Sequence, residues 1–422
     1  MPDYSLVWPQ GEKFMPVMMT RRSSTRYRGR RGPGKGLLIG ILAAALLAAG
    51  VFFAVRLLPK PAPEPAPVST APPEETLAPT PEPTPALAAV PERVRGIYIS
   101  GPVAGDPYMD TLLELVDDTE LNTVVIDVKN DEGSLTYRPA SGQAVELGAC
   151  VNYIRDLPGL VAELKGRGVY TIARVVAFKD PVLAQARPEL ALHGPDGKAV
   201  SEGGGAAWVN PYDPEVRAYL TEVALGAAEA GFDEVQFDYV RFPTGKGMDQ
   251  VDYGRSAEGI TKEDAVVAFL ESVRAALHEQ GVRLSADVFG TVIDSKLDAG
   301  LIGQDYARMA SAVDYLCPMV YPSHYAAGSF GLDVPDSQPY ETVVSALVGS
   351  RGALSRSTQQ EGQAGVRPWL QDFTATWVKG HIPYGAAELR AQIQAVYDAG
   401  YTDWLLWNAK NTYTAEGLLP AE

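Results

Sequence analysis

The chain has 422 residues, of which 46% are hydrophobic, and its formal net charge is −16. Residues 1–60 carry a net charge of +8, so the rest of the chain carries −24. An acidic folded part argues against nucleic acid as a partner, because phosphate binding requires a positive protein surface. Cys150 and Cys317 are the only cysteines, which excludes a disulfide framework, and we expect neither thiol to be catalytic.

A basic segment precedes an uncharged apolar run near the N-terminus. The run spans residues 37–55 and is bounded by Lys35 and Arg56. About 20 such residues cross a bilayer, and the basic residues before them place the N-terminus in the cytoplasm. A cleaved signal peptide is the alternative, although its apolar core is normally about 7–15 residues long. We therefore predict a basic cytoplasmic tail over 1–35 and a single transmembrane helix over 36–58, which makes the lipid bilayer a partner.

Twelve prolines, mixed with Ala, Glu and Thr, follow between residues 59 and 91. This composition cannot bury a core, so it predicts a disordered, extended linker over 59–92. At about 3.1 Å per residue the linker holds the next domain several nanometres from the membrane. We expect residues 93–422 to form that domain, outside the cytoplasm.

Strand-like and helix-like runs alternate through residues 93–422. The predicted strands are Gly96–Ser100, Thr123–Asn130, Val169–Phe178, Glu234–Phe242, Arg283–Gly290, Tyr315–Pro322, Arg367–Phe373 and Asp403–Asn408. The predicted helices are Tyr108–Asp118, Gly159–Arg167, Pro214–Ala230, Thr261–Gln280, Gln304–Ala312, Tyr340–Ser355 and Gly385–Ala399. Strict alternation implies a parallel sheet, and eight strands favour closure into a (β/α)8 TIM barrel of the α/β class. No G-x-G-x-x-G motif follows a strand, and we expect no cofactor.

Several predicted helices end on a glycine directly before the next strand, as C-caps do. These glycines are Gly168, Gly231, Gly281 and Gly400. They mark the amino ends of the strands, so the carboxyl ends form the opposite face, where barrel enzymes keep their active sites.

Polar side chains stand at most of those predicted carboxyl ends. In the fourth strand Gln236 and Asp238 share one face of a period-2 pattern, and Arg241 follows at its end. The candidates on the other strands are Asp127, Lys129, Arg174, Asp287, His324, Tyr325, Gln371, Asp372 and Asn408. Lys129 or Arg174 alone would be equally consistent with a structural ion pair to a buried Asp. Polar side chains at the carboxyl ends of seven predicted strands together favour a functional site.

Paired carboxylates in such a site suit glycoside hydrolysis, in which one carboxyl donates a proton and the other attacks or activates water. Asp238 and Asp287 lie on neighbouring predicted strands and are our candidates for this pair. Tyr321 and Tyr325 are the rings that we expect to line the pocket. The four histidines have no zinc-site spacing, so we expect no metal. One insertion is rich in acidic residues: Asp249, Asp252, Glu258 and Asp264. We interpret it as a solvated loop, and a bound Ca²⁺ is the alternative.

The stretch Phe232–Pro243, FDEVQFDYVRFP, closely resembles the signature of the DUF4015 glycosyl hydrolase domain family of bacterial surface proteins. The resemblance covers nearly all of residues 93–415 in the expected order. Supporting stretches are Arg95–Tyr98, Val125–Lys129, Ile172–Asp180, Trp208–Tyr212, Pro318–Tyr325 and Arg367–Phe373.

The family is similar to α-amylase-like barrels, whose nucleophile is an Asp ending strand four and whose acid is a Glu ending strand five. The resemblance therefore implies Asp238 as the nucleophile. Asp287, not Glu, stands at the strand-five position, and Gln236 replaces the amylase-type Arg two residues before the nucleophile.

These observations predict a membrane-anchored, extracytoplasmic glycoside hydrolase that acts on a cell-wall or surface polysaccharide. Asp238 is expected to be the nucleophile or base and Asp287 the acid, with Asp127, Lys129, Arg174 and Arg241 tuning them and binding hydroxyls. The alternative is a non-catalytic barrel that binds glycan as an envelope or sporulation scaffold.

Overall fold

The computed structural model describes residues 85–202, 205–245, 247–357 and 362–421. Its nine strands run parallel in one sheet, in the order β5-β4-β3-β2-β1-β9-β8-β6-β7. They are β1 (Arg95–Ile99), β2 (Thr123–Lys129), β3 (Tyr170–Val176), β4 (Glu234–Asp238), β5 (Arg283–Phe289), β6 (Tyr315–Met319), β7 (Gly365–Val366), β8 (Trp369–Gln371) and β9 (Trp404–Trp407). A further pairing between β5 and β6 closes the sheet into the predicted barrel.

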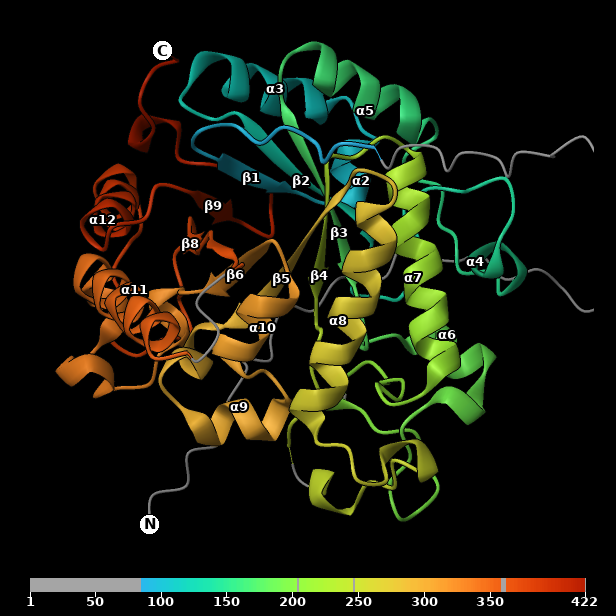
Figure 1. Ribbon diagram of the computed structural model, residues 1–422. Helices are drawn as coiled ribbons and strands as arrows, with labels where there is room; N and C mark the ends of the chain where they lie inside the picture. The colour runs from blue at the N-terminus through green and yellow to red at the C-terminus, as the bar shows by residue number, and fades with distance from the viewer. Residues whose placement is uncertain (1–84, 203–204, 246, 358–361, 422) are drawn as a thin grey trace, which may run out of the picture. The chain divides into compact units, whose positions relative to one another are not determined.

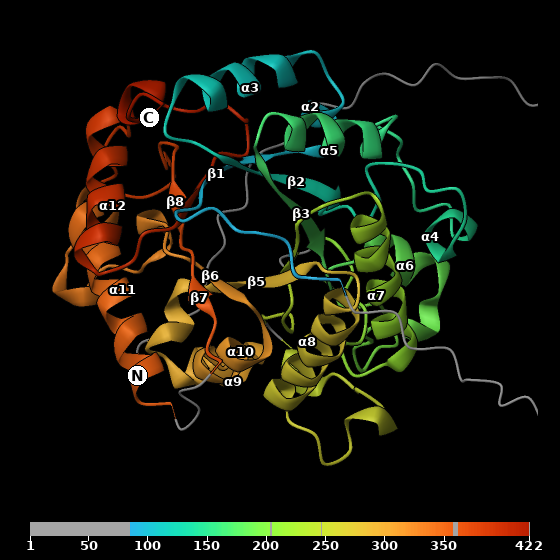
Figure 2. The same cartoon turned by 45° about the horizontal axis from the view of Figure 1, so that its top comes forward.

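Helices surround the strands on the outside of the barrel (Figure 1), as the turned view in Figure 2 also shows. The helices are α2 (Gly101–Ala104), α3 (Tyr108–Asp118), α4 (Gln143–Glu146), α5 (Leu157–Gly166), α6 (Pro181–Ala186), α7 (Pro214–Glu229), α8 (Lys262–His278), α9 (Lys296–Ile302), α10 (Tyr306–Ala312), α11 (Pro339–Ser355) and α12 (Ala386–Asp398). All seven helices predicted from the sequence are present; the short α2, α4, α6 and α9 were not predicted.

Local capping explains where the long helices begin and end. Asp213 accepts a hydrogen bond from the Glu215 backbone N–H at the start of α7, and Thr261 forms a capping box with Asp264 at the start of α8. The four predicted C-cap glycines all have positive φ, which confirms their position after the helices.

The barrel has two apolar compartments. The larger lies between strands and helices and includes Val128, Phe237 and Val288. The smaller includes Tyr170, Cys317 and other side chains from alternate strand positions, as expected for a barrel interior.

Buried charge also lies on the interior side of the strands. Arg367 Nη1 donates to Glu234 Oε1 at 2.9 Å, and the Tyr170 hydroxyl donates to Glu234 Oε2 at 3.0 Å. Glu234, Gln236 and Asp238 alternate along β4, so this ion pair lies two side-chain layers from Asp238 along the strand.

Several strands are shorter than predicted, and in two of them a particular residue explains why. The fourth ends at Asp238, not Phe242, because Tyr239 has φ of 50° and turns the backbone out of the extended conformation. The seventh, predicted over Arg367–Phe373, is observed only as β8, and the two-residue β7 lies before the predicted range. Pro368, which has no N–H to donate to a neighbouring strand, separates the two.

The predicted cytoplasmic tail (1–35), membrane span (36–58) and most of the linker (59–92) lie outside the described residues, so these remain predictions. Within the described ranges, no helix is long and apolar enough to span a bilayer.

Candidate functional site

A small cavity of about 80 Å³ lies at the carboxyl ends of the strands. It is lined by charged and aromatic side chains from several strand ends. They are Asp131, Arg174, Asp238, Tyr239, Asp287, Phe289, Met319, Tyr321, His324, Trp369 and Trp407. The structure therefore brings together five of the predicted site residues here: Arg174, Asp238, Asp287, Tyr321 and His324.

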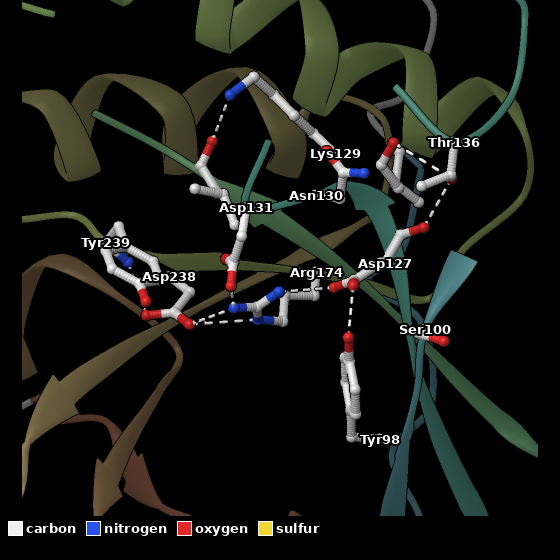
Figure 3. Close-up of polar contacts among 12 residues, drawn as sticks. Tyr98, Ser100, Asp127, Lys129, Asn130, Asp131, Thr136, Arg174, Asp238 and Tyr239 are labelled. Carbon is white, nitrogen blue, oxygen red and sulfur yellow. Dashed lines mark hydrogen bonds and ion pairs between the residues drawn. The ribbon is translucent and has the colours of Figure 1, made fainter. Parts of the chain in front are cut away.

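Arg174 on β3 connects three carboxylates. Its guanidinium donates to Asp127 at 2.6 Å, to Asp238 at 2.5 Å and to Asp131 at 3.2 Å, and Figure 3 shows the three carboxylates converging on it. Burial alone would lower the pKa of Arg174, but these carboxylates raise it well above its ordinary value. Arg174 is thus a permanently charged centre that orients the acidic groups.

Asp238 is held from both sides. Its Oδ2 accepts from Arg174 Nε at 3.2 Å and Nη2 at 2.5 Å, and its Oδ1 accepts from the Tyr239 backbone N–H at 2.6 Å. The left-handed conformation of Tyr239 makes the latter contact part of a strained turn. Gln236 stands where the amylase resemblance implies an arginine, and Arg174 from the neighbouring strand supplies the guanidinium instead.

Asp287 on β5 has a different environment. Its Oδ1 accepts a hydrogen bond of 2.7 Å from the Trp369 indole N–H. Burial, together with the negative charge of Asp238, raises the pKa of Asp287 well above its ordinary value. Asp287 is therefore suited to hold a proton at a pH where ordinary carboxyls are ionised.

Asp127 and Asp131 complete the acidic group. The Tyr98 hydroxyl donates to Asp127 at 2.5 Å, opposite the contact with Arg174. Burial raises the pKa of Asp127 to about 6, although Arg174 and Tyr98 favour its ionised form. At Asp131 burial is outweighed by Arg174 and Lys179, so its pKa is lowered.

Two of the predicted β6-loop residues, Tyr321 and His324, line the cavity. Their rings are in edge contact, with centroids 5.1 Å apart. Burial lowers the pKa of His324 to about 4, so this imidazole is neutral at physiological pH. It can donate or accept a hydrogen bond there without adding positive charge.

Lys129 does not join the site, although it was predicted there together with Asp127, which lies two residues before it on β2. The register between β2 and β3 shifts between these two residues, which breaks the period-2 alternation. Lys129 Nζ lies 2.9 Å from Asp180 Oδ2 and donates to the Val176 carbonyl at 2.7 Å. Figure 3 shows its side chain extending away from Arg174. The structural ion pair, which the sequence left open, is the correct interpretation.

This ion pair has a testable consequence. Lys129→Met is expected to lower the free energy of unfolding by about 3–5 kcal/mol, because it leaves Asp180 charged and fully buried. Chemical denaturation measures the change. Lys198→Met is the matched control, since Lys198 and its partner Asp196 are both largely exposed and their ion pair should contribute little to stability. A loss no larger than that of the control would contradict this role.

Arg241 and Gln236 are also directed away from the cavity lining. Arg241 Nη2 donates to Glu202 at 2.8 Å, and its guanidinium lies 4.8 Å from the centre of the Trp208 ring. The turn at Tyr239 ends β4 at Asp238, before Arg241, which was predicted at the end of this strand. Gln236 donates to Cys317 Sγ at 3.2 Å within the barrel.

The other four predicted binding residues do not line the cavity. The Tyr325 ring packs on Phe330, with centroids 5.1 Å apart. Three side chains tie loops together instead of facing the cavity: Gln371 bonds Asp336 and the Ser323 backbone, Asp372 bonds Thr414, and Asn408 bonds the Asp372 and Thr412 carbonyls. They support the site from outside it.

Several site residues were not predicted. They are Tyr98, Asp131, Tyr239, Phe289, Met319, Trp369 and Trp407. Tyr239, Trp369 and Trp407 were visible as aromatic side chains near strand ends, but nothing local distinguishes a lining ring from a core ring. Tyr98, like Asp127, occupies an inward position near the carboxyl end of its strand, and that position is the signal that could have identified it.

Comparison with known families gives one match. Residues 96–413 match the DUF4015 family, described as "Putative glycosyl hydrolase domain". No curated protein matches the chain.

Many solved structures are similar to this chain, among them these three. A hypothetical protein from Ruminiclostridium thermocellum is 33% identical over 46% of this chain and 97% of its own, with a TM-score of 0.42. The PgaB (BpsB) glycoside hydrolase domain from Bordetella bronchiseptica is 16% identical over 75% of this chain and 94% of its own, with a TM-score of 0.56. The glycoside hydrolase domain of PelA from Pseudomonas aeruginosa is 13% identical over 79% and 98%, with a TM-score of 0.43. The PgaB likeness shows a shared fold.

Proposed function

Because the chain belongs to the DUF4015 glycosyl hydrolase domain family, we propose that it cleaves glycosidic bonds in a cell-wall or surface polysaccharide. Asp287 is the proton donor and Asp238 is the nucleophile or base. The observation that carries the proposal is the contrast between two carboxyl groups at the same cavity. Asp238 is paired with Arg174, whereas Asp287 is buried with a raised pKa. Such a division between two carboxyls is the arrangement that glycoside hydrolysis requires.

The reaction begins with the protonated Asp287 giving its proton to the glycosidic oxygen, so that the leaving sugar departs as a neutral alcohol. The ionised Asp238 either attacks the anomeric carbon or takes a proton from the water that attacks it. In both cases positive charge develops on the sugar ring, close to the Asp238 carboxylate.

Arg174 and its partners keep Asp238 ready for this step. The guanidinium fixes the direction of the Asp238 carboxylate through two N–H groups, while Asp127 and Tyr98 fix the guanidinium. Arg174 touches Asp238 and lines the cavity, so it also has access to sugar hydroxyls.

The proposed location follows from the sequence. Residues 36–58 would anchor the chain in the cell membrane, with the N-terminus in the cytoplasm, and the proline-rich linker would carry the barrel into the envelope. A substrate in the cell wall or on the cell surface agrees with that placement.

The test is reducing-end release from a panel of purified envelope and storage polysaccharides, with wild type and Asp238→Asn side by side. We expect wild type to release reducing ends from at least one polysaccharide and the variant to release at least about 100-fold fewer. Equal release by both proteins would refute the role of Asp238. Binding without release by wild type would favour the glycan-binding scaffold.

A further inference from the structure

A row of aromatic rings leads from the cavity to the protein surface. Tyr321 lines the cavity, and its ring is in edge contact with Phe373, centroids 6.2 Å apart. Phe373 in turn stacks on Trp377, with centroids 5.9 Å apart and an interplanar angle of 24°. The Trp377 side of the row is open, because this residue is 49% exposed. Trp377 is thus an exposed ring that is linked by ring contacts to the cavity lining.

The loop that carries Trp377 is held in place on both sides. Gln371 donates to the Phe373 carbonyl at 3.0 Å, and the Tyr384 backbone N–H donates to Thr374 Oγ1 at 3.0 Å. The Tyr384 hydroxyl also donates to the Asp336 carbonyl at 2.9 Å, and Ala375 is fully buried. The ring is therefore presented from an anchored loop, which lowers the entropy cost of stacking a ligand on it.

We propose that Phe373 and Trp377 form a separate sugar-binding subsite, which holds a polysaccharide one or more sugars away from the bond that Asp238 and Asp287 cleave. The inference rests on the proposed function. A pyranose ring has an apolar face of C–H bonds, and that face packs on the negative face of an aromatic ring as other apolar groups do. The ligand is a chain, because the row runs outward from the 80 Å³ cavity over three successive rings.

The position of the row also predicts the mode of action. A subsite outside the cavity contributes affinity only to chains long enough to reach both places. The protein should therefore prefer polysaccharides and long oligosaccharides over short ones.

The experiment measures binding of trisaccharides and hexasaccharides by calorimetry. The probes are malto-, cello-, chito- and xylo-oligosaccharides, and the proteins are full-length Asp287→Asn and the same chain carrying Trp377→Ala. Asp287→Asn serves as the background so that cleavage does not consume the probe. We expect at least one hexasaccharide to bind more tightly than its trisaccharide. Trp377→Ala should weaken the hexasaccharide by about 2- to 12-fold and leave the trisaccharide unchanged.

Two further variants separate stacking from folding. Trp377→Phe keeps a ring and should retain most of the hexasaccharide affinity, whereas Trp377→Leu keeps an apolar side chain and should lose it. If no hexasaccharide binds the parent more tightly than Trp377→Ala, the subsite is overturned. Binding that depends on Trp377, without cleavage of any glycan by wild type, would uphold the subsite and overturn the hydrolase. Cleavage of a glycan by wild type, with hexasaccharide binding that does not depend on Trp377, would uphold the hydrolase and overturn the subsite.

Discussion

Asp287→Asn is expected to lower kcat/KM for the native polysaccharide by about 10²- to 10⁴-fold, the usual contribution of a general acid. The amide cannot donate a proton to the glycosidic oxygen, and the carboxyl that it replaces holds one because burial and Asp238 raise its pKa. The Trp369 indole N–H can still donate to the oxygen of the introduced amide, so the cavity should keep its shape.

A substrate with a good leaving group distinguishes this role from a general loss of structure. The 4-nitrophenyl glycoside of the cleaved sugar needs little protonation, so its hydrolysis by Asp287→Asn should fall far less than that of the polysaccharide. Asp372→Asn is a matched control, because Asp372 is a buried carboxyl on the same face that bonds Thr414 and not the cavity. Equal losses on both substrates would contradict the role of Asp287 as the acid.

Arg174→Met is expected to have the largest effect on stability and to abolish measurable cleavage. It removes the partner of three carboxylates at once and leaves Asp127 and Asp238 buried without a counter-charge. Loss of one partner from a buried ion pair costs about 3–5 kcal/mol. The remaining Asp238 would also lose the two N–H groups that orient it.

Chemical denaturation and reducing-end release measure the two effects of Arg174→Met. Arg308→Met is the control, since Arg308 and its partner Asp264 are both about half-exposed, and the variant should change stability little. Arg174→Lys keeps the positive charge but loses the planar set of N–H donors. Compared with Arg174→Met, it should restore more of the stability than of the cleavage activity. Full activity in Arg174→Met would contradict the account of the site.

The alternation of strands and helices was sufficient to predict the barrel, because eight apolar strand-like runs are separated by seven helix-like runs. The ends of the strands were harder to place. One predicted strand begins only after Pro368, and the turn at Tyr239 shortens another. The alternation of apolar and polar residues does not reveal where tertiary contacts bend the end of a strand.

The same limit explains the mixed outcome for the predicted site residues. Asp238, Asp287 and Arg174 meet at the cavity because they occupy inward positions on neighbouring strands. Lys129 was placed wrongly because a register shift of one residue moves a side chain to the other face. Gln371 and Asn408 stand at strand ends like the site residues, but they bond loops, and a sequence alone does not separate these two uses of a polar side chain.

The most direct test of the central claim is the pH dependence of kcat/KM for cleavage of one glycan, with its binding affinity measured over the same pH range. We predict that the rate falls as the pH rises through the raised pKa of Asp287, because the acid then loses the proton that it must donate, whereas the binding affinity stays nearly constant. Glycan binding of nearly constant affinity, with no cleavage at any pH, would contradict that claim and identify the barrel as a binding scaffold.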